Sequence, residues 1–182
     1  AASLLDFDAE TAERALNATA SMPAGTKRNF GSMTKPLHAG LCARSGVTAA
    51  LLAAEGLTTS TTAVSGEQGF WDLYGPEPAG AFTFGEEWAL ETEGIHAKAY
   101  PCCYFTHTAI AATQALTDDI DPEAIDRIEV TAAGGAGDAL TYPDPETGLE
   151  AKFSMEHAVA CAAVRDRIDL AAFEADALAD GA

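Results

Sequence analysis

The sequence has few basic residues and no long apolar run, and these absences exclude several classes of protein. Lysine and arginine together number 10 against 28 aspartates and glutamates, for a net charge of −18. Nucleic acids and anionic membranes would be repelled, because phosphate binding requires clustered lysine and arginine. No segment approaches the roughly 18 consecutive apolar residues of a membrane span, and the first residues lack the basic stretch of a signal peptide. We therefore predict a cytoplasmic protein that binds neither nucleic acid nor membrane.

The cysteines and glycines do not form a recognised metal or cofactor motif. No two of the four cysteines are spaced as C-x-x-C, the pattern of zinc ribbons and thioredoxin-like sites. The glycine-rich residues 134–138 lack the Gly-Lys-Ser/Thr ending of a P-loop and do not match G-x-G-x-x-G. We expect four free thiols, as in an intracellular protein, and a plain turn at the glycines.

What the sequence does contain is typical of a folded protein from a salty environment. Hydrophobic residues make up 48% of the chain, and the acids are spread along it rather than gathered in one tail. Carboxylates at this density repel one another, but at ~1 M salt the Debye length is about 3 Å and the repulsion is screened. We therefore predict a halophilic protein.

Residue patterns predict a mainly helical chain with a smaller mixed segment. Helices are expected over residues 8–20, 36–55, 106–116, 154–164 and 170–178. Residues 95–100 and the alternating residues 124–132 are expected to be strands on either side of one of these helices. Strand, helix and strand in that order suggest a small α+β unit beside a helical one.

The helix over residues 36–55 is the most clearly bounded of these elements. Pro36 suits the first helical position, so Lys35 is the expected N-cap, and Gly56 suits the position after the last turn. Small residues dominate the helix, so other helices can approach it closely. We expect it to be buried among them.

Two segments are rich in groups that could carry chemistry. At the start of the 36–55 helix, Lys35 and His38 lie beside free backbone amides, an arrangement that fits an anion site but equally an ordinary capped helix. Residues 96–107 hold two histidines, a lysine, two tyrosines and two cysteines, a density that favours proton transfer. Their spacing fits no standard zinc pattern, and a packed turn is the competing interpretation.

Four blocks of the sequence together resemble one family. Residues 29–40 (NFGSMTKPLHAG), 66–70 (GEQGF), 98–107 (KAYPCCYFTH) and 150–155 (EAKFSM) are similar, in this order, to blocks of MmgE/PrpD proteins. That resemblance implies a large all-helical domain and a smaller α+β lid, with the site between them. Residues 1–82 would then belong to the helical domain, 83–148 to the lid, and 149–182 to the helical domain again.

The resemblance also implies an activity. Known members of the family include 2-methylcitrate dehydratase, cis-aconitate decarboxylase and iminodisuccinate epimerase, which move a proton beside a carboxylate without metal or organic cofactor. We therefore expect a lyase for a small di- or tricarboxylate, most similar to 2-methylcitrate dehydratase and serving propionate metabolism. The resemblance further leads us to expect a homodimer.

Six residues are carried over as site residues. Lys35, His107 and Tyr142 are the expected catalytic residues. Substrate binding is expected from three others, namely His38, Lys98 and Cys103. Cys103 stands where the decarboxylase branch has a histidine, which argues against decarboxylation.

A second hypothesis stays open. The family's chains are more than twice as long, and the part that precedes this sequence normally brings an acidic residue and histidines to the site. The chain could therefore be a non-catalytic fragment, or a subunit that pairs with a separate N-terminal half.

Overall fold

The computed structural model describes residues 1–22, 25–75 and 87–179, and within these ranges it is helical and contains no strand. The predicted mainly helical character is thereby confirmed. The chain divides into two compact units. The first unit is Ala1–Gly25 with Pro36–Glu93, and the second unit is Thr26–Lys35 with Gly94–Ala182. The expected domain boundary at residues 82 and 83 lies outside the described residues.

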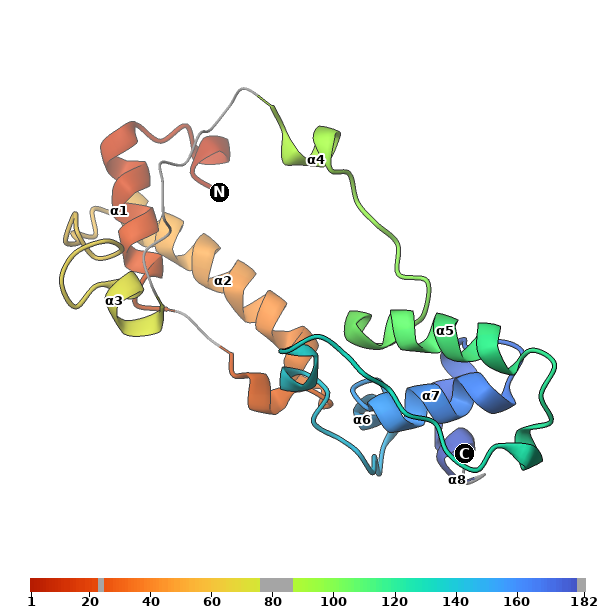
Figure 1. Cartoon of the computed structure of the whole chain (residues 1–182). Helices are drawn as coiled ribbons and strands as arrows, with labels where there is room; N and C mark the ends of the chain where they lie inside the picture. Colours follow the sequence, from red (N-terminus) through yellow and green to blue (C-terminus); the bar gives the residue numbers. More distant parts are fainter. Residues whose placement is uncertain (23–24, 76–86, 180–182) are drawn as a thin grey trace. The chain divides into compact units, whose positions relative to one another are not determined.

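The first unit is built around α1 (Ala9–Thr19) and most of α2 (Thr34–Ala54), with α3 (Phe70–Tyr74) and α4 (Ala89–Thr92) as single turns. Helix α1 lies against α2 (Figure 1). Ala15 of α1 packs with Ala50 and Ala53 of α2, and Phe7 covers them. All three core side chains are methyl groups, so this core buries little apolar area and contributes little free energy to folding.

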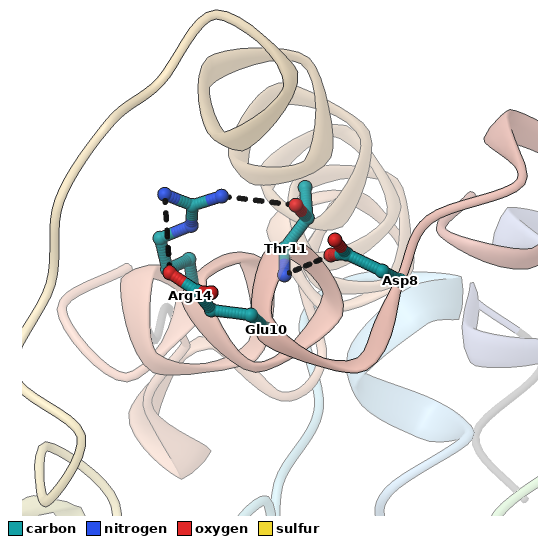
Figure 2. A network of polar contacts seen from close by, with 4 residues as sticks. All are labelled: Asp8, Glu10, Thr11 and Arg14. Carbon is teal, nitrogen blue, oxygen red and sulfur yellow. Dashed lines mark hydrogen bonds and ion pairs between the residues drawn. The ribbon is translucent and has the colours of Figure 1, made fainter.

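A local polar network fixes the start of α1 (Figure 2). The Asp8 carboxylate accepts a hydrogen bond from the Thr11 N–H at 2.8 Å, and the same contact lowers the pKa of Asp8. One turn on, the Arg14 guanidinium donates to the Thr11 hydroxyl at 2.9 Å and lies 3.8 Å from Glu10. The exposed ion pair adds little, whereas the N-cap satisfies one of the free N–H groups of the first helical turn.

Helix α2 ends as predicted but begins two residues earlier. The Gly56 N–H donates to Ala53 O at 3.1 Å and the Leu57 N–H to Leu52 O at 3.0 Å, which together form a Schellman motif with Gly56 at φ 88°. At the other end, Lys35 lies inside the helix and is not its N-cap.

The earlier start of α2 has a local cause. The Ser32 hydroxyl accepts a hydrogen bond from the Thr34 N–H at 3.3 Å, and the Ser32 carbonyl accepts one from the Lys35 N–H at 3.2 Å. One turn is therefore already closed before Pro36. Proline is tolerated there, because its missing N–H is an orphan donor anywhere in the first helical turn.

Burial of α2 among other helices was also predicted, and for the single chain this is wrong. Only three of its residues are buried, all of them alanines on one strip: Ala49, Ala50 and Ala53. Apolar residues occur on every side of α2. The rest of the first unit covers only the strip of three alanines and leaves the other sides of the helix exposed. Helix α2 is long and apolar enough to cross a membrane. Core helices of other proteins meet the same criterion, so its length and composition are weak evidence for a membrane span.

The second unit is built around two helices that lie side by side, α5 (His107–Thr117) and α7 (Met155–Val164) (Figure 1). Ile110 of α5 and Cys161 of α7 belong to the larger core cluster of the described chain, to which Phe173 of the Leu170–Phe173 turn also contributes. The short helices α6 (Gly148–Ala151) and α8 (Ala175–Ala179) flank this pair. Six 3-10 turns complete the described chain: Ser3–Leu5, Lys27–Asn29, Tyr104–Thr106, Pro122–Ala124, Ala136–Asp138 and Leu170–Phe173.

Side-chain caps mark where α6 and α7 begin. The Ser154 hydroxyl accepts a hydrogen bond from the His157 N–H at 3.0 Å at the start of α7. Thr147 and Glu150 form a capping box on α6. The predicted helices over residues 106–116 and 154–164 are confirmed, and the one over 170–178 is split between a 3-10 turn and α8.

The two predicted strands are not formed in the described structure. Residues 95–98 and 125–133 run without regular structure, and no second strand lies beside either of them in the described ranges. Alternation of apolar and polar residues suits an extended chain, but a strand also needs a neighbour for its backbone N–H and C=O groups. The turn predicted at the glycines is present, with Gly135 at φ 89° and the Asp138 N–H donating to its carbonyl at 3.1 Å.

Candidate functional site

Lys35 is held over two aromatic rings of the second unit. Its ammonium nitrogen lies 5.1 Å from the centre of the Phe30 ring and 5.4 Å from that of Phe153. The two rings also contact each other, with centroids 5.4 Å apart. Cation–π attraction of this kind is worth about 0.5–2 kcal/mol and is directional enough to fix where the charge sits. The fold therefore places this lysine, which the sequence alone could not do.

Tyr142 lies against the same segment and holds it in place. Its hydroxyl donates to the Phe30 carbonyl at 2.6 Å, across 112 residues of sequence. The ring packs on Gly31, which has φ 79°, and a Cβ built there would lie 2.5 Å from a ring carbon. Only glycine satisfies both the backbone angle and the close approach. Two of the predicted site residues, Lys35 and Tyr142, are thus brought together through Phe30.

The turn before α5 is tied together by polar contacts. The Lys98 ammonium donates to the Cys102 carbonyl at 2.8 Å. The Thr106 hydroxyl donates to the Cys103 carbonyl at 2.8 Å and lies 3.1 Å from the Cys102 sulfur. The Cys103 N–H donates to the Lys152 carbonyl at 2.8 Å, so the turn is joined to the residue just before Phe153. Cys103 and Lys35 are therefore anchored on neighbouring residues.

His107 is buried at the first position of α5, with 8% of its surface exposed. Its ring meets Tyr100 edge-on at 5.3 Å between centroids and lies 5.2 Å from Tyr104. The Nε2 atom is buried and has no hydrogen-bond partner in the part of the chain that the structure describes. A buried nitrogen without a hydrogen bond costs about 1–3 kcal/mol. A hydrogen bond from Nε2 to a group outside the described residues would therefore be favourable.

Two of the cysteines are protected by burial. Burial raises the pKa of the Cys102 thiol, against a weaker opposing effect of the Thr106 hydroxyl and the charges of Lys98 and Lys152. Burial likewise raises the pKa of Cys161, whose sulfur lies 3.4 Å from His157 Nε2 in the α5–α7 core. A thiol held neutral is a poor nucleophile, so neither residue is suited to covalent catalysis.

His38 is the predicted site residue of the first unit. It packs on Gly25, where an added Cβ would lie 2.9 Å from the ring Nδ1. Of the six predicted site residues, five belong to the second unit and His38 does not.

No group of three or more histidine, cysteine, aspartate or glutamate side chains suited to a metal ion occurs in the described ranges. The predicted site residues of the second unit instead carry ammonium, phenol, thiol and imidazole groups. Groups of these kinds can bind an anion and move a proton.

Comparison with known families decides the identity of the chain. Residues 1–82 match the model of the MmgE/PrpD N-terminal domain, and residues 100–182 match that of the MmgE/PrpD C-terminal domain. The chain belongs to the MmgE/PrpD family. Membership supports a lyase or dehydratase-like function at the level of the family. No curated protein matches the chain with significant similarity.

For this MmgE/PrpD protein, sequence reasoning missed three residues around the site. Phe30 and Phe153 fix Lys35, and Lys152 anchors Cys103, yet none of them was predicted to have a role. Their place within the blocks at 29–40 and 150–155 was the available signal. What the sequence could not supply is that these two blocks meet, since contact between distant segments is decided by the packing of the whole unit.

Proposed function

We propose that this protein is a hydro-lyase similar to 2-methylcitrate dehydratase, acting on a small di- or tricarboxylate. The observation that carries the proposal is that Lys35 and Lys98 have no acidic partner in the described residues, although acids outnumber bases 28 to 10. Lysines surrounded by so many carboxylates would pair readily. An ammonium group that makes no ion pair in the described residues is available to an external anion.

The surroundings of Lys35 suit a carboxylate ligand. Two rings cover one side of its ammonium, which removes part of its water and leaves the other side open to an acceptor. A charge-assisted hydrogen bond to a carboxylate is about twice as strong as one between neutral groups, and partial desolvation strengthens it further. Lys35 would bind one carboxylate and Lys98 another, with Cys103 lining the space beside them.

His107 is the residue we propose as the base. Its buried Nε2 has no hydrogen-bond partner among the described residues, and it can accept a proton from the carbon next to a bound carboxylate. The electron pair of that C–H bond forms the new carbon–carbon double bond, and the bond to the neighbouring hydroxyl breaks. The proton then passes from the imidazolium to the departing hydroxyl, so the products are an unsaturated acid and water.

Tyr142 and Cys103 are given supporting roles. The Tyr142 hydroxyl is engaged with the Phe30 carbonyl, so it positions the segment that carries Lys35. Cys103 supplies no imidazole at its position, which favours dehydration over decarboxylation. In line with the family resemblance, the proposed step uses neither metal nor organic cofactor.

The setting of the reaction is part of the proposal. We place it in a high-salt cytoplasm, on the basis of the net charge of −18, and in propionate metabolism. Residues 95–100 and 124–132 would form strands of an α+β lid once neighbours pair with their unsatisfied backbone groups.

Incubation with 2-methylcitrate in molar KCl tests the proposal, with the ultraviolet absorbance of the conjugated product as the readout. Wild type and Lys27→Met should form product, because Lys27 is an exposed lysine of the same unit. Lys35→Met should lose most of the rate. Absence of product from the wild type, or equal rates for both variants, would refute the proposed activity.

A second candidate function is favoured by the exposure of α2. A helix so apolar and so little buried, next to a core of three alanines, suits a subunit that pairs with a second polypeptide or with its own copy. Light scattering in molar KCl separates the cases: a monodisperse monomer that is active argues against an obligate partner, whereas a dimer or an inactive monomer supports one.

A further inference from the structure

Residues 126–132 of the second unit form a stretch of backbone whose N–H and C=O groups have no hydrogen-bond partner among the described residues. Ile125 bounds the stretch on one side, where its N–H donates to the Pro122 carbonyl at 3.1 Å. Ala133 bounds it on the other, where its carbonyl accepts the Ala136 N–H at 3.2 Å. The stretch contains no proline, no glycine and no residue with positive φ, so nothing in it interrupts a strand. Backbone of this kind is a template for pairing with another strand.

The side chains of this stretch divide into an apolar set and a charged set. Ile128 and Val130 line two cavities, one with α5 and one with α7, and 38% and 41% of their surfaces stay exposed. Arg127 and Glu129 alternate with them and form an ion pair at 2.8 Å, with 76% and 73% of their side chains exposed. A strand formed here would therefore have one face toward the two helices and a charged face toward solvent.

The charged set is self-complementary about Ile128. If two copies pair as antiparallel strands with Ile128 opposite itself, Arg127 of each copy faces Glu129 of the other. The pairing then has two cross-strand pairs of opposite charge, which are stabilising. Centring the two strands on Arg127 or on Glu129 instead would place that residue opposite its own copy, and like charges directly opposite are destabilising. The charges therefore select one register.

Two-fold symmetry also keeps the apolar set on the covered face. The axis is perpendicular to the plane of the paired strands, so α5 and α7 of both copies lie on one side of them and both charged sets lie on the other. Each copy carries a net charge of −18, and the repulsion between copies is screened at about 1 M salt, where the Debye length is about 3 Å. In molar salt a second copy thus satisfies the backbone groups, the charges and the apolar face together.

We infer that residues 125–133 are an interaction surface for a second copy of the chain, paired as antiparallel strands about a two-fold axis at Ile128. The surface contains none of the six predicted site residues. The inference therefore goes beyond the proposed function and does not depend on it.

Disulfide cross-linking tests the register. Exposed Cys42 is replaced by serine in every variant, and the Cys42→Ser parent reports any cross-link made by the other native thiols. Arg127→Cys and Glu129→Cys chains with tags of different length are co-expressed, purified in molar KCl and oxidised with diamide. We expect a mixed disulfide dimer, because directly opposite residues have Cβ atoms about 4.5–5.5 Å apart. Either variant alone should not cross-link, since its two thiols would be diagonal neighbours about 7–8 Å apart.

The control for chance collisions is Arg28→Cys, at an exposed position of the same unit. Co-expressed with Glu129→Cys, it should give no mixed dimer above the level of the parent.

Charge reversal tests the complementarity. Arg127→Glu makes both charged positions acidic and Glu129→Arg makes both basic, so each variant alone would place like charges opposite. We expect each to dimerise about tenfold more weakly than the wild type or worse, and the mixture of the two to recover the wild-type dissociation constant. Sedimentation equilibrium at one fixed KCl concentration measures these constants. Arg28→Glu is the matched control and should leave the constant unchanged.

The results separate the candidate partners of this stretch. A mixed disulfide, with affinity recovered in the mixture of charge variants, supports the two-fold pair. A dimer that forms without the mixed disulfide has its interface elsewhere, for example on α2, and refutes the inference. A monomer in molar KCl without any cross-link also refutes it and leaves the stretch to pair within its own chain, for example with residues 95–98.

Discussion

Replacing Gly31 by alanine should destabilise the second unit far more than the same change at an open glycine. Gly31 has φ 79°, and a Cβ there would lie 2.5 Å from the Tyr142 ring. The left-handed backbone costs a residue with a Cβ about 1–2 kcal/mol, and overpacking adds about 1–3 kcal/mol. We therefore expect Gly31→Ala to lower the free energy of unfolding by about 2–5 kcal/mol.

Gly135 provides the matched control. Its φ of 89° is similar, but the nearest atom to an added Cβ would be an Asp138 carboxylate oxygen at 3.9 Å. Gly135→Ala should therefore show the backbone cost alone, about 1–2 kcal/mol. Urea denaturation at one fixed molar KCl concentration, followed by far-ultraviolet circular dichroism, measures both values.

A double-mutant cycle isolates the contact with the ring. In a Tyr142→Ala background the clash is removed, so Gly31→Ala should cost no more than Gly135→Ala. The coupling between positions 31 and 142 should then be about 1–3 kcal/mol. Equal effects of Gly31→Ala in both backgrounds would mean that Tyr142 does not pack on Gly31, and the placement of Lys35 by this contact would be refuted.

Three further predictions use other properties of the chain. Lys35→Met should weaken carboxylate binding by about 1.5–3 kcal/mol and lower the free energy of unfolding by about 0.5–2 kcal/mol, the worth of the lost cation–π contacts; wild-type affinity would show that Lys35 is only structural. Melting temperatures should be much lower in about 0.1 M than in multimolar KCl, because the screening length falls from about 10 Å to under 3 Å; equal values would refute the halophile hypothesis. The raised pKa values of Cys102 and Cys161 mean that the folded state holds these protons more tightly, so stability should fall as pH rises above about 8.5, and alkylation should reach exposed Cys42 first; pH-independent melting between pH 8 and 10 would contradict this.

Local chemistry accounts for the parts of the fold that the sequence predicted well. Asp8 caps α1 through a residue three positions away, and Gly56 ends α2 through carbonyls within five residues of their donors. Such interactions depend on neighbours in the chain, so they can be inferred before any packing is known. The start of α2 also depends on local contacts. It lies two residues before the position that Pro36 suggests, because the Ser32 hydroxyl and carbonyl accept hydrogen bonds from the N–H groups of Thr34 and Lys35.

Elements that need a distant partner were predicted less well. Residues 124–132 alternate as a strand should, but they have no strand beside them in the described structure. Alternation of apolar and polar residues describes the two faces of an extended chain, but it does not specify which strand would form hydrogen bonds with it. The burial expected for α2 failed in the same way, because small residues permit close packing without supplying a neighbour.

The sequence by itself determined the charge, the helical character and the family blocks of this protein, all of which are carried by composition or by short runs of residues. Tertiary structure alone decided that Lys35 sits over Phe153, that Tyr142 reaches the Phe30 carbonyl, and that Lys152 joins the Cys103 turn. These contacts link segments more than a hundred residues apart or on opposite sides of α5. They exist because the α5–α7 core holds those segments together, and no local preference of the chain encodes such a meeting.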